Sequence, residues 1–283
     1  MNYHHAYHAG NFAEVIKHAI LARVVAHLRE KPAAFRVLDR HAGAGLTDLA
    51  GPEASRTGEW RDGIGRLRAA SLDDRVRELL APYFAAIEAL NTTGRLLAYP
   101  GSPVLVRSWL RPQDRLLACE LDPAAAAALA RHLQGDVRAK VVTIDGWTAL
   151  AAYLPPKERR GAVLIDPPFE QPNEFARLAD GLARAHRKWP TGTYLAWYPI
   201  KDRRDSDAFA RKLARTGIPK ILRVELTVAP DRAAERLAGT GLMVINPPWT
   251  LEGELLVLLP ALARVLGRGR PGTFRLDRLT TKN

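Results

Sequence analysis

The stretch AVLIDPPF, residues 162–169, joins four consecutive apolar residues to an aspartate, two prolines and an aromatic ring. A short apolar run that ends at a proline pair is typical of a buried strand, because proline has no N–H to donate to a sheet. A second stretch, VINPPW at residues 244–249, has the same shape with asparagine in place of aspartate. The two endings raise the question of which of them carries chemistry.

Strand and helix patterns alternate on both sides of residues 162–169. Apolar runs typical of strands occupy residues 35–39, 115–122, 140–146, 193–200, 220–228 and 242–246. Helical spacing of apolar residues marks residues 11–30, 123–133, 148–154, 173–188, 207–216 and 250–266. This alternation predicts an α/β fold with a doubly wound, mostly parallel sheet of seven strands and helices on both faces. No helix pattern separates the last two strands, so we expect an antiparallel edge.

Residues 46–99 interrupt the alternation with apolar residues at helical spacing and no clear strand. We therefore predict three parts: residues 1–45 with the first helix and strand, a helical insert at 46–99, and the remainder of the core at 100–283. The insert carries an arginine cluster that is either a solvated helix face or a phosphate-binding surface; it comprises Arg56, Arg61, Arg66, Arg68, Arg75 and Arg77. The basic tail after residue 266 is expected to be loosely ordered near its end.

The charge balance of the chain narrows the class of partner. Its 283 residues include 42 Lys and Arg against 30 Asp and Glu, a net charge of +12, which favours nucleic acid, although a GC-rich genome also enriches arginine. The single cysteine, Cys119, excludes an internal disulfide and thiolate zinc clusters. The histidines of the first residues lack metal-ligand spacing, so no metal is expected. The chain also lacks a signal-peptide pattern and a membrane-length apolar run, which predicts a cytoplasmic protein with no membrane partner.

Acidic residues follow four successive strands of the predicted sheet: Asp39, Glu120, Asp145 and Asp166. Parallel strands bring their carboxyl ends to one edge, where ligands of open α/β sheets bind. The small-residue turn HAGAG, residues 41–45, follows the first strand and lets a ligand approach the backbone. A carboxylate after the second strand can accept both hydroxyls of a ribose, and one after the third can accept an adenine amine. The set predicts a nucleoside-containing cofactor.

With these motifs the chain resembles the Rossmann-like class I S-adenosylmethionine-dependent methyltransferases. It is most similar to the bacterial family that methylates adenine N6 in 23S ribosomal RNA. The resemblance runs from Tyr3 to Trp249 and rests on YHHAYHAGNFAEVIKH, LDRHAGAG, YPGSP, ELDP, DG, LIDPPF, WYPI, TGIPKIL and GLMVINPPW. It implies a methyltransferase core with a helical insert after the first strand, S-adenosylmethionine as cofactor, 23S ribosomal RNA as partner, and a monomer.

The resemblance also implies roles for individual residues. The residues expected to contact S-adenosylmethionine are His18, His41, Ser102, Glu120, Asp145, Gly146 and Asp166. Asp166 is in addition the expected catalytic residue. The residues expected near the target base are Tyr3, His5 and Lys17. Phe169 stands where many relatives have tyrosine, so a role for the tyrosine hydroxyl is in doubt here.

The chemistry of residues 166–169 suits an exocyclic amine, whose lone pair is delocalised into the adenine ring. A carboxylate oxygen of Asp166 and the backbone carbonyl of Pro167 can accept its two N–H groups, and Phe169 can stack on a base flipped out of the RNA. The NPPW stretch at 246–249 follows the last strand, toward an edge of the sheet. We interpret that stretch as a strand stop.

Three alternatives to an rRNA enzyme remain open on sequence. The same chemistry could act on DNA adenine, although no separate recognition domain is evident, or on a protein glutamine, for which asparagine rather than aspartate is usual at position 166. A non-catalytic RNA-binding assembly factor with a vestigial pocket is the third. The intact set of Glu120, Asp145 and Asp166 argues against that factor.

Overall fold

The structure is a computed structural model, and it describes residues 5–229 and 237–280. Its helices are α1 (Phe12–Arg29), α2 (Pro52–Thr57), α3 (Arg66–Ala69), α4 (Asp74–Glu88), α5 (Ser102–Trp109), α6 (Pro123–His132), α7 (Gly146–Ala152), α8 (Glu174–Lys188), α9 (Arg203–Ala214) and α10 (Leu251–Leu266), with a 3-10 turn η1 (His5–His8) and a π turn η2 (Arg61–Gly65). Its strands are β1 (Arg36–Asp39), β2 (Leu46–Asp48), β3 (Ala98–Pro100), β4 (Arg115–Glu120), β5 (Ala139–Thr143), β6 (Gly161–Ile165), β7 (Thr193–Ile200), β8 (Ile221–Thr227), β9 (Gly239–Ile245) and β10 (Thr273–Thr280).

Eight strands of the described chain form one sheet in the order β10-β8-β9-β7-β6-β1-β4-β5. Strands β5, β4, β1, β6 and β7 are parallel to their neighbours in that half of the sheet. Strand β9 is antiparallel to both β7 and β8 and lies between them. The Rossmann-like, mostly parallel sheet with antiparallel strands is confirmed. The last two expected strands do pair with each other, but they are not the edge.

The expected count of seven strands is wrong, whereas the end of the basic tail, which was expected to be loosely ordered, lies outside the described residues after position 280. Residues 273–280 form β10, which pairs antiparallel with β8 and adds an eighth strand. An uncovered β8 would present unpaired backbone groups to solvent, and the tail satisfies them. Arg223 fixes the pairing, because its guanidinium donates to both oxygens of Asp277 at 2.8 and 2.7 Å.

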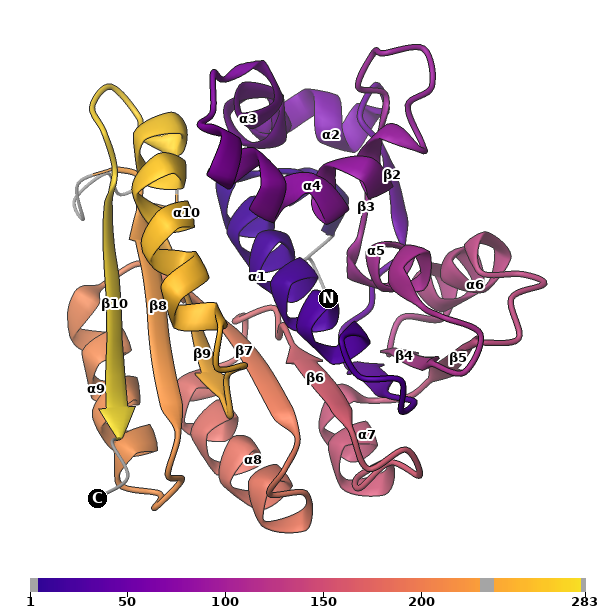
Figure 1. Cartoon of the computed structure of the whole chain (residues 1–283), viewed down its shortest axis with the longest axis vertical. Helices are drawn as coiled ribbons and strands as arrows, with labels where there is room; N and C mark the ends of the chain where they lie inside the picture. The colour runs from indigo at the N-terminus through magenta and orange to yellow at the C-terminus, as the bar shows by residue number, and fades with distance from the viewer. Residues whose placement is uncertain (1–4, 230–236, 281–283) are drawn as a thin grey trace.

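Two helical layers cover the sheet (Figure 1), and they explain the continuous apolar run in β6. Helices α1, α5, α6 and α10 pack on one face, and α7, α8 and α9 pack on the other. Ala162 and Leu164 of β6 point into the first layer, whereas Val163 and Ile165 point into the second. A strand buried on both faces has no polar side, so its sequence shows no alternation.

The helical insert lies above α1 at the top of Figure 1 and is closed at its base by two short strands. Strands β2 and β3 pair antiparallel, with Leu46 opposite Pro100 and Asp48 opposite Ala98. The expectation of no strand within residues 46–99 is therefore wrong, since three-residue strands leave no periodic pattern to read. Helix α4 is confirmed over the stretch where apolar spacing predicted it. The insert as a separate subdomain of residues 46–99 stays a prediction.

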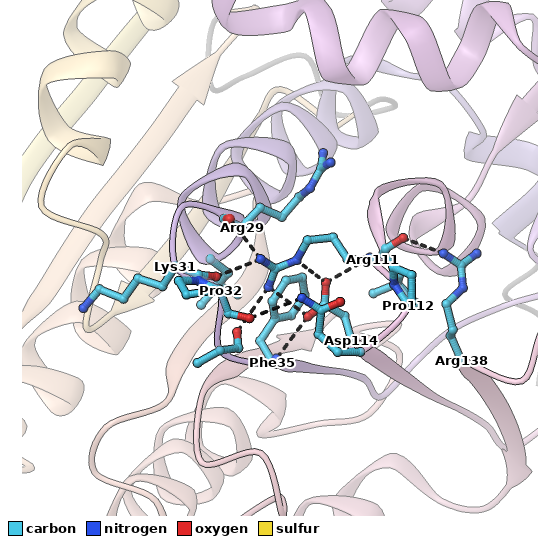
Figure 2. Close-up of polar contacts among 12 residues, drawn as sticks. Arg29, Lys31, Pro32, Phe35, Arg111, Pro112, Asp114 and Arg138 are labelled. Carbon is cyan, nitrogen blue, oxygen red and sulfur yellow. Dashed lines mark hydrogen bonds and ion pairs between the residues drawn. The ribbon is translucent and has the colours of Figure 1, made fainter.

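Arg111 holds the loop between α1 and β1 against the start of β4 (Figure 2). Its guanidinium binds Asp114 through Nε at 2.8 Å and Nη2 at 3.0 Å. The same group donates to three backbone carbonyls of the loop, those of Arg29, Lys31 and Ala33. Asp114 is fully buried and also accepts the N–H of Phe35 at 3.2 Å, the residue before β1. One ion pair thus fixes where the first strand enters the sheet.

Helix α10 contains the most apolar stretch that the sequence offers, and it packs on the sheet. Leu255, Leu258, Leu259 and Leu262 are buried in the core, at most 1% exposed. None of the helices in the described ranges is both long and apolar enough to span a membrane.

Candidate active site

The four acidic strand ends lie along one edge of the sheet. Strands β1, β4, β5 and β6 are parallel neighbours, so Asp39, Glu120, Asp145 and Asp166 all leave the sheet on the same side. In the register of the sheet, Asp39 lies opposite Ala118 of β4 and Leu164 of β6. The expectation that these carboxylates gather at the carboxyl edge agrees with this topology, although their individual roles stay predictions.

Glu120 is held in place by the backbone of the glycine turn. Its Oε2 accepts the N–H of Gly43 at 2.8 Å, and its Oε1 accepts the N–H of Asp122 at 2.9 Å. Gly45 has φ +84°, and a Cβ there would lie 2.5 Å from the side chain of Leu129. The turn therefore needs glycine both for its conformation and for its close packing on α6.

The turn after β5 is equally tight. Asp145 caps α7, because its Oδ1 accepts the N–H of Thr148 at 2.9 Å. A Cβ on Gly146 would lie 2.6 Å from the carbonyl oxygen of Arg40 and 2.7 Å from Nε2 of His41. Only glycine lets this turn approach the first one so closely, so the two turns pack against each other at the carboxyl edge of the sheet.

Arg40 and Trp147 hold these two turns together, and neither residue was predicted from the sequence. Arg40 is 1% exposed, its Nε donates to the carbonyl of Gly146, and its guanidinium lies 4.6 Å from the centroid of the Trp147 ring. Arg177 lies over the same ring at 4.9 Å. Burial lowers the pKa of Arg40 to about 9. No motif signals this role, because it depends on contacts across residues that are distant in the sequence.

Asp166 forms a buried ion pair with Lys17 of α1. The Nζ of Lys17 contacts Oδ2 of Asp166 and also Oε1 of Glu14. Lys17 is 3% exposed and Asp166 6%. Burial lowers the pKa of Lys17, but the carboxylates of Asp166 and Glu14 outweigh it and raise the pKa above its ordinary value. Neither the contact of Lys17 with Asp166 nor that with Glu14 was predicted, and the expected place of Lys17 near the target base stays a prediction.

A chain of buried polar groups leads from this ion pair to the helical insert. Nε2 of His18 lies 3.6 Å from Oε2 of Glu14, and its Nδ1 lies 2.8 Å from the hydroxyl of Tyr99. That hydroxyl lies 2.7 Å from the hydroxyl of Tyr83 in α4. Burial raises the pKa values of Tyr83 and Tyr99 well above the ordinary range, so both stay neutral. His18 is fully buried, and its contact with a cofactor stays a prediction.

His41 and Ser102 line the space between Asp39 and Asp166. The backbone N–H of Asp166 donates to Nδ1 of His41 at 3.2 Å, which ties the two strand ends together. Burial raises the pKa of Asp39 to about 6, against the opposing effects of the Ser102 hydroxyl, Lys17 and the backbone N–H of His41. The structure thus places His41 against Asp166 and Ser102 against Asp39, and their contact with a cofactor stays a prediction.

The loop after Asp166 turns sharply at Phe169. Pro167 is buried, and Phe169 has φ +52°, a left-handed conformation that is uncommon for an aromatic residue. The Phe169 ring packs edge-on against the rings of Phe175 and Trp197, with centroid distances of 4.9 and 5.8 Å. Such strain is maintained by surrounding contacts and is frequent at functional sites.

The insert holds the segment that carries the expected base-binding residues. Oε2 of Glu59 lies 3.0 Å from Nδ1 of His8, and Thr57 donates to the carbonyl of Tyr7 at 2.6 Å. The Glu59 carboxylate raises the pKa of His8 despite partial burial. His5 begins η1, but its side chain is not described, and Tyr3 lies outside the described residues. Their roles at the target base stay predictions.

The NPPW stretch lies at the opposite edge of the sheet from Asp166. Strand β9 is antiparallel to β7, so its end at Ile245 lies beside Tyr194 near the start of β7. The Nδ2 of Asn246 donates to the carbonyls of Pro190 and Gly192, both at 2.8 Å. The amide is therefore bound to a turn of the backbone, in agreement with the interpretation of this stretch as a strand stop.

Comparisons with known proteins agree with the geometry. A family model described as "Ribosomal RNA large subunit methyltransferase D, RlmJ" matches residues 32–280. The chain is 41% identical over 260 residues to "Ribosomal RNA large subunit methyltransferase J" of Escherichia coli (strain K12), with 92% of each chain covered. It is 38% identical over 281 residues to the protein of the same name from Haemophilus influenzae, with 99% of each covered.

A solved structure extends this likeness to the fold. A crystal structure of a protein from Legionella pneumophila strain Philadelphia 1 is 32% identical, with a TM-score of 0.86, and the match covers 96% of this chain and 98% of that one. The match of the family model and the two relatives cover nearly the full length, including the glycine turn and residues 166–169. The chain belongs to the ribosomal RNA large subunit methyltransferase J family.

Proposed function

We propose that the protein transfers a methyl group from S-adenosylmethionine to N6 of an adenine in 23S ribosomal RNA, with Asp166 as the catalytic residue. Membership of the family makes the chain an rRNA methyltransferase. The observation that carries the finer proposal is the position of Asp166, which follows a parallel strand beside the glycine turn and is bound by Lys17. The expected monomeric state and cytoplasmic location stay predictions.

The residues at the carboxyl edge fit S-adenosylmethionine. Gly146 and Gly45 let the two turns at this edge pack closely on neighbouring parts of the chain, which fixes the backbone groups that would contact the cofactor. We assign the ribose hydroxyls to Glu120, which the backbone holds from one side, and the adenine to Asp145 and Gly146. His18, His41 and Ser102 are assigned to the remainder of the cofactor. The bound cofactor supplies an activated methyl group, and the protein needs no strong nucleophile.

The task of this chain is to direct the amine toward the methyl group. Asp166 can accept one N–H of the amine, and the Pro167 carbonyl can accept the other, which draws the nitrogen lone pair out of conjugation with the ring. Lys17 contacts Oδ2, so we assign the amine to Oδ1. The contact with the Lys17 ammonium fixes the direction of the Asp166 carboxylate. Correct orientation of two reacting groups supplies a large part of the rate enhancement in such reactions.

Phe169 supplies an apolar ring next to these acceptors. Its packing against Phe175 and Trp197 fixes the ring plane, so a flipped adenine can stack on it at little entropic cost. The hydroxyl that many relatives carry at this position is absent, and the proposed chemistry does not use it.

Replacement of Asp166 by asparagine tests the proposal. Asp166→Asn keeps the shape of the side chain but loses its charge, and we expect transfer of tritiated methyl groups to unmethylated 23S RNA to fall about 100-fold or more. The matched control is Asp180→Asn on the surface of α8, for which we expect no change. Calorimetric titration with S-adenosylhomocysteine separates loss of catalysis from loss of cofactor binding. Full activity of Asp166→Asn would contradict the assignment.

A further inference from the structure

A pocket of about 480 Å³ is lined by Phe169 and by residues of the loop and helix that follow it. It opens between the loop after β6, the amino-terminal parts of α8 and α9, and the end of β7. Its size is in the range of small-ligand sites. Within the described chain its lining includes neither Asp166 nor Lys17, so it is separate from the site assigned above.

One wall of the pocket is aromatic. Phe169, Phe175 and Phe209 line it, with ring centroids 4.9 Å apart for the first pair and 5.3 Å apart for the second. Phe209 is 2% exposed and packs against Tyr198, which holds its ring in place. A rigid surface of this kind favours a flat ring, because stacking then requires little reordering of side chains.

The polar side of the pocket contains three carboxylates, together with two amides and two lysines. Glu174 is 5% exposed, and its Oε1 has no hydrogen-bond partner among the described residues; the nearest cation is Nη1 of Arg177 at 3.9 Å. Burial raises the pKa of Glu174. Asp202 and Asp205 complete the acidic side. The carboxylates accept hydrogen bonds and lie in the same pocket as the aromatic wall, so a flat ring that carries N–H donors fits both features.

We propose that this pocket binds a second nucleobase of the RNA substrate, an amine-bearing base close in sequence to the methylated adenine, with Phe169 between the two. The inference rests on the proposed function and extends it to a sequence-reading site. Guanine, cytosine and adenine each carry an exocyclic amine that can donate two N–H groups to a carboxylate, whereas uracil has carbonyl oxygens and no exocyclic amine. Unpaired RNA bases are read in this manner, by stacking on aromatic rings and by hydrogen bonds to their edges. Lys201 also lines the pocket and is exposed, so it can face a phosphate of the same strand.

The test combines a protein variant with changes in the RNA. The variant is Glu174→Gln, and its matched control is Glu170→Gln, an exposed residue of the same loop that does not line the pocket. The RNA is transcribed 23S RNA in which each amine-bearing base within three nucleotides of the methylated adenine is changed, one at a time, to uridine. Steady-state kinetics give KM for each combination.

We expect KM of the wild-type protein to rise about tenfold for one of the changed RNAs. Glu174→Gln should raise KM for unchanged RNA by a similar factor. The two changes together should have about the effect of one, since both remove the same contact. Affinity for S-adenosylhomocysteine and the KM of Glu170→Gln should not change. Asp205→Asn, with an exposed side chain, repeats the test if Glu174→Gln proves unstable in thermal unfolding.

Two outcomes would overturn the pocket assignment alone. One is an unchanged KM for Glu174→Gln. The other is a KM increase for the combined protein and RNA change that equals the product of the two separate increases at every RNA position. Failure of the wild-type protein to methylate adenine in unchanged 23S RNA would instead overturn the proposed function, and the pocket assignment with it.

Discussion

Replacement of Lys17 by methionine should destabilise the protein through the carboxylates that it leaves behind. Lys17 is 3% exposed and contacts both Asp166 and Glu14. At contact distance each pair contributes roughly 5 kcal/mol of attraction at an effective dielectric constant near 20, most of which offsets the desolvation of the three charges. Loss of one member of a buried pair costs about 3–5 kcal/mol. We therefore expect the free energy of unfolding to fall by about 3–5 kcal/mol at pH 7.5.

The effect should depend on pH in one direction. The folded-state pKa of Lys17 is raised, so its contribution is fully present below its unfolded pKa, near 10.4, and constant between pH 5 and 7.5. In Lys17→Met the buried carboxylate of Asp166 and the partly buried carboxylate of Glu14 have no cation, which disfavours their charged forms in the folded state. The folded variant then binds protons that the unfolded chain releases, and its deficit relative to wild type should shrink as the pH falls from 7.5 to 5.

Urea unfolding at both pH values measures this, with Lys212→Met as the matched control. Lys212 forms an ion pair with Asp180 at 2.9 Å, but the two side chains are 43% and 59% exposed. Exposed pairs of this kind contribute at most about 1 kcal/mol. A loss for Lys17→Met no larger than that of the control, or a deficit that grows toward pH 5, would refute the buried ion pair as described.

Three further predictions test other parts of the structure. The pKa of Asp39 is about 6, so the wild-type protein loses stability as this carboxylate ionises between pH about 4 and about 6. Asp39→Asn should remove this loss and raise the free energy of unfolding at pH 7 by up to about 3 kcal/mol. Identical pH profiles of the free energy of unfolding for the two proteins would contradict this prediction. Arg111→Ala should lower the free energy of unfolding by about 3–5 kcal/mol, because it leaves the buried carboxylate of Asp114 without its cation. Chemical denaturation measures this, and a loss below about 1 kcal/mol would contradict the prediction. Exchange of Arg56, Arg61 and Arg68 for glutamate should weaken RNA binding and reduce by about 2 the slope of the logarithm of the RNA-binding constant against the logarithm of salt concentration. Cofactor affinity is the control and should not change. Unchanged RNA affinity would show that these arginines of the insert do not contact the RNA.

The parallel half of the fold could be predicted because its strands are buried on both faces and separated by amphipathic helices. That pattern located β6 at Gly161–Ile165, α1 at Phe12–Arg29 and α10 at Leu251–Leu266 to within a few residues. Strand β10 could not be found in the same way. It lies at an edge, alternates charged and apolar residues, and is ordered by its pairing with β8 rather than by its own composition.

The candidate site was visible in sequence only where residues follow strands. Asp39, Glu120 and Asp166 could be placed together because parallel strands end at one edge. The contact between Lys17 and Asp166 joins residues 149 positions apart, and spacing alone gives no sign of it. Glu14 and Lys17 are three residues apart in α1, but this spacing does not show that the pair also meets Asp166. The insert arginines were also only partly informative, since Arg66 pairs with Asp62.

The most direct test of the central claim is the identity of the methylated nucleoside. Purified wild-type protein and S-adenosylmethionine are incubated with unmethylated 23S RNA, which is then digested and resolved by nucleoside mass spectrometry. A carboxylate directed at an exocyclic amine should yield N6-methyladenosine at one position, and Asp166→Asn should yield none above background. Methylation at a ring nitrogen, at a ribose oxygen or on another base would contradict the role assigned to Asp166.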